Sequence, residues 1–259
     1  MKRIVFCAVP VVDHDEPIMA PAVLQSVARQ AGWHSRTLDL NALFLREIKN
    51  YPHRQDLVEQ FLYHEGMQCA EHVVDFFVSM VNRFADMITD CKPDVIALSL
   101  LTSNSQVFAR WLAVEIRSRV PDQEIIIGGS GIKNFIANTN NSWAEGLRSA
   151  GIINHYIMGD GEIALREYLQ GNLTYSGIDS NSWTQIEDLD SLPFPDYSDY
   201  DWSLYARPAM PLVDSRGCVR TCEFCDIIEH WTRYQYRRAE SVFAEMLHQI
   251  QQHGIRSEE

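Results

Sequence analysis

Five short apolar stretches alternate with helix-like segments through the first two-thirds of the chain, and this alternation limits the folds open to it. The stretches span residues 2–9, 34–40, 93–100, 124–127 and 154–158. Helical patterns span residues 17–31, 106–119, 144–150 and 162–169, with a longer helical region at 41–90 that Tyr51-Pro52 interrupts. Continuous apolar strands between helices predict an α/β fold with a parallel sheet covered on both faces. We expect a doubly wound domain of the flavodoxin-like or Rossmann-like type.

The loops that follow these strands are the expected ligand-binding positions. In doubly wound sheets, ligands bind beyond the carboxyl ends of the strands. Those loops cover residues 11–15, 99–103, 128–131 and 159–162. The sequence therefore predicts a ligand site at this edge of the sheet.

The rest of the chain differs in composition and indicates a second unit. Residues 172–208 are rich in Ser, Asn, Asp and Pro and carry several aromatic residues, which is typical of a linker that packs between domains. A short strand at 209–213 and a helix from about Glu240 to His253 follow. We expect a sheet domain at 1–171, a linker at 172–208 and a second, partial domain at 209–259.

The charge balance argues against two classes of partner. The chain has 22 basic and 35 acidic residues, a formal net charge of −13, whereas nucleic acids and anionic membranes attract lysine and arginine. The N-terminal apolar stretch is too short for a signal peptide, and no apolar run approaches membrane-spanning length. Six cysteines are too few for a disulfide scaffold. We expect a cytoplasmic protein that binds neither nucleic acid nor membrane.

Three cysteines, Cys218, Cys222 and Cys225, lie in one short run with Cys-x3-Cys-x2-Cys spacing. Structural zinc takes four protein ligands, usually from paired Cys-x2-Cys units. A [4Fe–4S] cluster held by only three cysteines instead keeps one iron open for chemistry. The spacing therefore favours an iron–sulfur cluster, and zinc completed by His230 is the alternative.

The run around these cysteines resembles the cluster loop that opens a radical S-adenosylmethionine (SAM) enzyme. Gly217 precedes the first cysteine, Phe224 precedes the third, and residues 236–242 are similar to the run that begins the next helix in many members. In that family SAM chelates the open iron, and an electron from the reduced cluster cleaves it to methionine and a 5′-deoxyadenosyl radical. The resemblance implies that the three cysteines hold the cluster, that Phe224 lies beside SAM, and that a (β/α) barrel begins here. It also implies a reducing partner such as flavodoxin or ferredoxin.

The first domain is similar to the cobalamin-binding (B12) domain of class B radical SAM proteins. Residues 99–102 resemble their Ser-x-Leu stretch, 128–129 their glycine pair, and 159–162 the turn before their last helix. Glycines let a backbone approach a large flat ligand, and a serine hydroxyl can hydrogen-bond a buried heterocycle. The resemblance implies cobalamin contacts at Ser99, Leu101, Thr102, Gly128, Gly129 and Glu162.

Two features depart from the family pattern. The first loop has Asp13-His14-Asp15 where many cobalamin domains carry Asp-x-His-x-x-Gly, although radical SAM members often lack that cobalt-binding histidine. Few residues follow Cys225, whereas a complete barrel needs several more βα units. We expect a truncated product, a fragment, or a chain whose barrel a partner completes.

The expected function is that of a radical SAM enzyme with a cobalamin domain, acting on a small-molecule or natural-product-type substrate, with methyl transfer as one outcome. Two alternatives stay open. One is a non-catalytic remnant that binds cobalamin or a cluster, and the other is a zinc-stabilised α/β binding module. The short motifs at 99–102 and 128–129 also fit plain strand-end turns, and 159–162 fits a helix start without a ligand.

Overall fold

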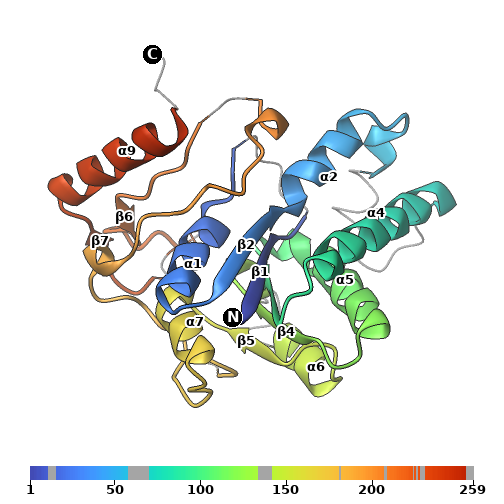
Figure 1. Ribbon diagram of the computed structural model, residues 1–259, viewed down its shortest axis with the longest axis horizontal. Coiled ribbons are helices and arrows are strands. Elements are labelled where there is room, and N and C mark those ends of the chain that lie inside the picture. The colour runs from blue at the N-terminus through green and yellow to red at the C-terminus, as the bar shows by residue number, and fades with distance from the viewer. Residues whose placement is uncertain are drawn as a thin grey trace.

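The chain folds into a five-stranded parallel sheet with helices on both faces, and a C-terminal segment lies next to helix α1 (Figure 1). The structure is a computed structural model. It describes residues 1–10, 16–57, 70–133, 142–180, 182–206, 209–223, 225, 227 and 231–254.

The sheet has the flavodoxin-like strand order β2-β1-β3-β4-β5. Its strands are β1 (Arg3–Ala8), β2 (His34–Asp39), β3 (Val95–Ser99), β4 (Glu124–Gly128) and β5 (His155–Ile157). All neighbouring pairs are parallel, and the register sets Ala8 opposite Ser99 and Ser99 opposite Gly128. The carboxyl ends of the central strands therefore form one straight edge. The predicted α/β class and doubly wound architecture are confirmed.

Helices cover both faces of this sheet. They are α1 (Met19–Gln30), α2 (Leu40–Lys49), α4 (Glu71–Asp90), α5 (Gln106–Arg119), α6 (Ser142–Ser149) and α7 (Gly161–Leu169). Helices α1 and α7 lie on one face, and the other four lie on the opposite face (Figure 1). Short 3₁₀ turns occupy Ser103–Ser105, Ser130–Ile132, Leu189–Ser191 and Trp202–Leu204.

The continuous apolar character of the strands follows from this two-sided cover. Side chains of a strand alternate between faces, so Ile4 and Phe6 join the core under α1 and α7, while Val5 and Cys7 join the larger core on the other side. All four are buried. A strand with only one buried face would alternate apolar and polar residues instead.

The helical region predicted at 41–90 begins and ends where local chemistry requires. The Asp39 carboxylate accepts a hydrogen bond from the backbone N–H of Ala42 at 2.8 Å and caps α2. Helix α2 stops at Lys49, just before Tyr51-Pro52, and α4 begins at Glu71. The break predicted at the proline is confirmed, because proline cannot continue the backbone ladder.

An aromatic cluster joins the segment after α7 to helix α1. Tyr197 and Tyr200 pack with Ala22, and the hydroxyl of Tyr200 donates to the backbone oxygen of Ile18 at 2.9 Å. Tyr205 donates to the Asp39 carboxylate at 2.6 Å. These contacts tie the segment to the sheet unit beside the carboxyl ends of the strands.

The C-terminal segment contains β6 (Ser215–Arg216), β7 (Gln235–Tyr236) and α9 (Ala239–His253). The strand predicted at 209–213 is wrong: the strand begins at Ser215 and pairs antiparallel with β7. Pro211 explains the shift, because it has no N–H to donate to a ladder. The helix predicted at 240–253 is confirmed and ends at Gly254, whose φ is 65°. None of the described helices has both the length and the apolar composition needed to span a membrane.

Candidate functional site

A pocket of about 550 Å³ lies between the carboxyl edge of the sheet and the C-terminal segment. The sheet unit contributes the ends of β3 and β4, the loop after β5, and the first turns of α1 and α7. The C-terminal segment contributes Ser215, Arg216, Gly217, Ile227 and Trp231. The volume falls within the range of small-molecule and cofactor sites, and the walls are mainly aliphatic.

Most of the predicted cobalamin contacts line this pocket. Ser99, Leu101, Gly128, Gly129 and Glu162 all border it. The structure does not bring Thr102 to the pocket wall; its Oγ1 is buried and makes no hydrogen bond within the described part of the chain. The loops predicted at 99–103, 128–131 and 159–162 thus meet at one site, and the loop at 11–15 lies outside the described residues.

The glycine pair Gly128-Gly129 is needed for the close approach of two loops. Gly129 has a φ of 99°, and a Cβ there would lie 2.2 Å from the backbone oxygen of Leu100. The amide of Leu100 donates to the oxygen of Gly128 at 2.9 Å, and Gly131 donates to the oxygen of Leu100 at 2.9 Å. Only glycine lets the β3 and β4 loops approach this closely. The pair therefore shapes the pocket wall, whatever ligand the pocket takes.

The turn at 159–162 is a hydrogen-bonding centre between three segments. A Cβ on Gly159 would lie 2.3 Å from the backbone oxygen of Thr184, which accepts from the Asp160 amide at 2.8 Å. The Asp160 carboxylate accepts from the backbone N–H of Ile186 at 2.9 Å and from the indole of Trp231 at 3.0 Å. Asp160 thereby joins the sheet unit to two later segments of the chain, one containing Ile186 and the other Trp231.

Arg216 forms a buried ion-pair bridge with the same turn. Its guanidinium lies 2.9 Å from Asp160 Oδ1 and 2.5 Å from Glu162 Oε1. The side chains of Arg216, Asp160 and Glu162 are 12%, 5% and 7% exposed. Burial lowers the pKa of the Arg216 guanidinium, but the two carboxylates outweigh it and raise that pKa. The bridge fixes the start of the cysteine loop, because Cys218 follows two residues later.

Sequence reasoning placed Glu162 in the first turn of α7 but missed its partner. Asp160 lies in the loop predicted at 159–162 but was not named as a site residue, and Arg216 and Trp231 were not predicted to contribute to the site. The sequence offered one signal for this pairing. Arg216 stands just before Gly217-Cys218, and the turn at 159–162 carries two acidic residues, Asp160 and Glu162. Buried carboxylates need a cation, so this pairing was open to inference.

The cysteine loop lies at the surface beside the pocket. Cys218 is exposed, and Cys222 and Cys225 are half-buried, with the Cys225 amide donating to the Cys222 oxygen at 3.0 Å. Gly217 has a φ of 83°, and a Cβ there would lie 2.4 Å from the backbone oxygen of Arg233. This glycine lets the loop leave β6 against the segment that leads into β7. Phe224 and His230 lie outside the described residues.

The spread of the three sulfur atoms bears on the zinc alternative. Zn–S bonds of 2.3 Å in a tetrahedron set sulfur atoms about 3.8 Å apart. Among the residues that the structure describes, the metal-ligating groups with all ligand atoms within 4.8 Å of one another do not include the three cysteines. At least one pair of the three sulfur atoms is thus farther apart than two ligands of one zinc ion are. Three thiols from one loop match a [4Fe–4S] cluster that keeps its fourth iron open, so the number of donors fits it.

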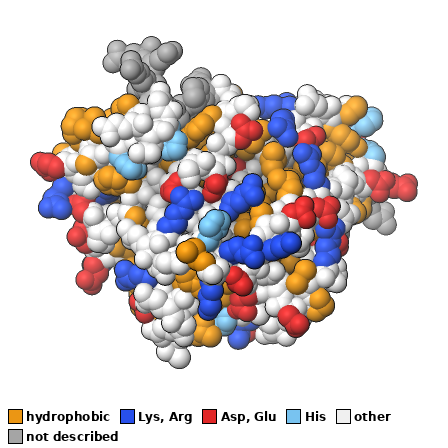
Figure 2. Space-filling view, viewed as in Figure 1, with side chains coloured by type: hydrophobic (Ala, Val, Ile, Leu, Met, Phe, Trp, Pro, Cys, Tyr) orange, Lys and Arg blue, Asp and Glu red, His pale blue; other side chains and the backbone are white. Residues whose placement is uncertain are grey.

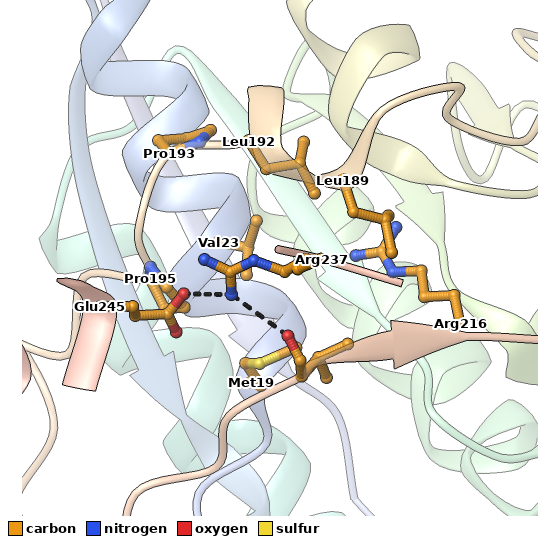
Figure 3. A pocket seen from close by; sticks show the side chains of 10 residues that line it. Met19, Val23, Leu189, Leu192, Pro193, Pro195, Arg216, Arg237 and Glu245 are labelled. Carbon is orange, nitrogen blue, oxygen red and sulfur yellow. Dashed lines mark hydrogen bonds and ion pairs between the residues drawn. The ribbon is translucent and has the colours of Figure 1, made fainter. Parts of the chain in front are cut away.

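A second, small cavity lies behind the bridge (Figure 3). Met19 and Val23 of α1 border it, together with Arg216, Arg237 and Glu245. Its volume of about 20 Å³ suits roughly one water molecule. This space is too small for a cofactor, so the larger pocket is the candidate site.

Comparison with solved structures gives the fold a known counterpart. The radical SAM methyltransferase TsrM from Kitasatospora setae, with cobalamin and a [4Fe–4S] cluster bound, matches with a TM-score of 0.55 at 16% identity. The same enzyme with tryptophan substrate and a SAM analogue bound matches with a TM-score of 0.53 at 17% identity. Each match covers 97% of this chain and 46% of that one. This chain shares their fold.

The match is one of fold, and it covers only part of each neighbouring chain. The chain spans less than half of each TsrM chain. No protein-family model and no curated protein matches the sequence. The shared fold runs through the sheet unit and the C-terminal segment alike, since almost the whole chain is covered.

The walls of the pocket indicate what kind of ligand it can take. Aliphatic side chains and two tryptophans form most of its walls. The charged groups of the wall are Arg216, Asp160 and Glu162, and the arginine forms ion pairs with both carboxylates. Glycine backbone forms one side, where a flat ligand can approach closely. The pocket thus suits a mostly apolar ligand with a flat face.

Proposed function

We propose that this chain carries the cobalamin-binding unit and the cluster loop of a radical SAM protein of the methyltransferase-like class. One observation carries the proposal: the pocket at the carboxyl edge of the sheet is also lined by Arg216 and Gly217, which lead directly into the cysteine run. A group bound at the sheet edge and a cluster bound by the loop would therefore be neighbours. Two cofactors that act on one substrate need this proximity.

In this proposal Cys218, Cys222 and Cys225 bind a [4Fe–4S] cluster and leave its fourth iron to SAM. Phe224 is proposed to contact SAM. When bound, the cluster supplies the electron that cleaves SAM to methionine and a 5′-deoxyadenosyl radical, and cobalamin supplies a methyl group for transfer. The surface position of the loop suits an approaching electron donor such as a flavodoxin or ferredoxin.

Cobalamin is proposed to occupy the pocket against Ser99, Leu101, Gly128 and Gly129. Thr102 Oγ1 is a buried hydroxyl without a hydrogen-bond partner among the described residues, and a polar group at the ligand's periphery is proposed as its partner. Glu162 acts indirectly, since it holds Arg216 and through it the cluster loop.

The chain's own residues exclude water and fix the two sites relative to each other. The aliphatic walls of the pocket keep the space between them apolar, which favours radical chemistry over side reactions with solvent. The Arg216 bridge holds the start of the loop against α7. A small-molecule or natural-product-type substrate and a reducing, cytoplasmic setting complete the proposal.

Anaerobic reconstitution tests the cluster assignment. The full chain is incubated with iron and sulfide, desalted, and assayed for iron per chain and for 5′-deoxyadenosine formed from SAM under a strong reductant. We expect about four irons per chain, lost when Cys218, Cys222 and Cys225 are replaced by alanine. Cys91→Ala is the matched control, because Cys91 is half-buried and lies in the sheet unit.

The outcomes separate the alternatives. Four irons with 5′-deoxyadenosine support the radical SAM assignment, whereas four irons without it support a chain that binds the cluster but does not cleave SAM alone. One zinc and no iron would contradict the cluster. Equal iron loss in Cys91→Ala would also contradict it, because the loss would then not depend on the loop.

A further inference from the structure

A second constellation of metal-ligating side chains lies outside the pocket, between the segment that follows α2 and the first turn of α4. Among the described residues, one group of three potential ligands has its atoms within 4.8 Å of one another, and it consists of His53, Asp56 and His72. None of the three lines the pocket. We propose that this His–Asp–His cluster is a site for a divalent transition metal of the zinc type.

Two of the three separations are close to those of direct ligation. His72 Nε2 lies 3.2 Å from Asp56 Oδ2, and His53 Nδ1 lies 3.8 Å from the same oxygen. Zinc bonds of 2.0–2.2 Å in a tetrahedron separate ligand atoms by about 3.3–3.5 Å. The third separation, between the two imidazoles, is at most 4.8 Å. A metal between the three side chains therefore requires the imidazoles to move closer together, and His53, which is 60% exposed, has room to turn toward the ion.

The donor set selects the class of metal. Two imidazoles and one carboxylate are typical of zinc and its first-row neighbours, whereas calcium and magnesium prefer an all-oxygen shell. One carboxylate gives the site a single negative charge to offset a divalent ion. The side chains are 39–60% exposed, so water completes the coordination.

The segments that carry the ligands are anchored to the core on both sides. Leu57 and Val73, next to Asp56 and His72, are buried in the main hydrophobic cluster. Tyr51 donates its hydroxyl to the backbone oxygen of His72 at 3.3 Å. Backbone positions fixed in this way let three short side chains converge without a large loss of entropy on metal binding.

A metal here would join two segments that are distant along the chain. His53 and Asp56 lie just after α2, and His72 lies in the first turn of α4. Residues 58–69 connect them covalently, so the ion would close this stretch of chain. Because the metal binds the folded arrangement, it should also raise the thermal stability of the chain.

Zinc titration of the full chain tests the site after Cys218, Cys222 and Cys225 are replaced by alanine, so that the cluster loop takes no metal. We expect about one zinc per chain by calorimetry and a higher Tm in zinc. His72→Gln and Asp56→Asn should each lower the affinity at least tenfold, since even supporting groups around a metal contribute 10–100-fold.

Two matched variants complete the experiment. His34→Gln and Asp75→Asn remove an exposed histidine and an exposed aspartate outside the cluster, and neither should change the affinity. Absence of zinc binding, parent-like affinity in both cluster variants, or equal losses in the matched variants would overturn the proposal. The test stands apart from the cobalamin and cluster assignments, because it needs neither cofactor.

Discussion

The parallel sheet and the C-terminal segment at 209–254 bury opposite kinds of side chain. In the sheet unit the buried residues are mostly aliphatic and aromatic, with Phe44, Phe77, Phe84 and Phe108 in ring contact. Among described residues after Tyr200, no hydrophobic side chain is buried, whereas Glu245 and Gln249 are. One region is held by burial of apolar area, and the other by directed polar contacts.

Helix α9 displays the difference most clearly. Glu245 and Gln249 face inward, where Glu245 pairs with Arg237 and Gln249 donates to the oxygen of Pro195 at 2.7 Å. Its apolar residues Phe243, Met246, Leu247 and Ile250 are 39–60% exposed. Hydrophobic side chains are visible on the surface over this helix (Figure 2). The sheet unit thus provides a rigid wall for the pocket, and the loop side depends on a few ionic groups.

The largest difference in stability should appear when one phenylalanine ring is removed from each region. Phe108→Ala removes a fully buried ring that contacts three other phenylalanines, and it should lower the free energy of unfolding by about 3–5 kcal/mol. Phe243→Ala on α9 should change it by less than about 0.5 kcal/mol, since this ring is 60% exposed. Denaturant unfolding of both variants measures the difference. Equal losses would show that α9 shares the packed core.

Removing the charge of Arg216 should destabilise the C-terminal segment nearly as much as loss of the Phe108 ring destabilises the sheet unit. Arg216→Met leaves Asp160 and Glu162 buried without a cation, and breaking such a pair costs about 3–5 kcal/mol. We expect faster proteolysis and hydrogen exchange after residue 209, while the sheet keeps its protection.

The matched control for this change is Arg238→Met. Arg238 also pairs with an aspartate, Asp190, at 2.9 Å, but its side chain is 75% exposed. This variant should exchange like the parent protein. Normal protection of the C-terminal segment in Arg216→Met would show that the bridge does not hold the loop.

A smaller effect is expected at the inner face of α9. Gln249→Ala leaves the buried oxygen of Pro195 without its donor, at a cost of about 1–3 kcal/mol. Hydrogen exchange should accelerate in α9 alone. Gln251→Ala, at an exposed position of the same helix, serves for comparison and should leave exchange unchanged.

The smallest effect should appear as a pH dependence in the sheet unit. The hydrogen bond between His155 and Asp179 raises the pKa of the imidazole, although burial opposes it. A histidine whose pKa is raised by folding adds stability below its unfolded pKa of about 6.5, and this is lost as pH rises through the folded pKa. The parent should therefore exceed His155→Gln in stability more at pH 6 than at pH 9. An equal difference at both pH values would contradict the assignment.

The sheet was predictable because its signal is local. Each strand is a continuous apolar run, and the alternation with helices fixes the parallel architecture without knowledge of long-range contacts. The carboxyl-edge loops followed from the same rule, which is why Ser99 and Gly128 could be named in advance. The order of the strands was not predicted, because the alternation fits both the flavodoxin-like and the Rossmann-like order.

The second region resisted prediction because its contacts are distant along the chain and polar. The partners of Arg216 lie more than fifty residues upstream, and no periodicity marks them. The apolar stripe of α9 predicts an inward face, yet the inward residues are Glu245 and Gln249. The ion pair between Glu245 and Arg237 overrides the apolar pattern of this helix. The strand predicted at 209–213 failed for a local reason, because Pro211 has no N–H to donate.

Cobalamin uptake tests the central claim, that the pocket between the two regions holds a corrin beside the cluster loop. Ala20→Trp places a large ring on an exposed, pocket-lining position of α1, and Ala244→Trp places one on an exposed position of α9 outside the pocket. Visible absorbance after desalting should give about one corrin per chain for the parent and Ala244→Trp, and at least a tenfold weaker affinity for Ala20→Trp. No corrin on the parent, or parent-like binding by Ala20→Trp, would contradict the account.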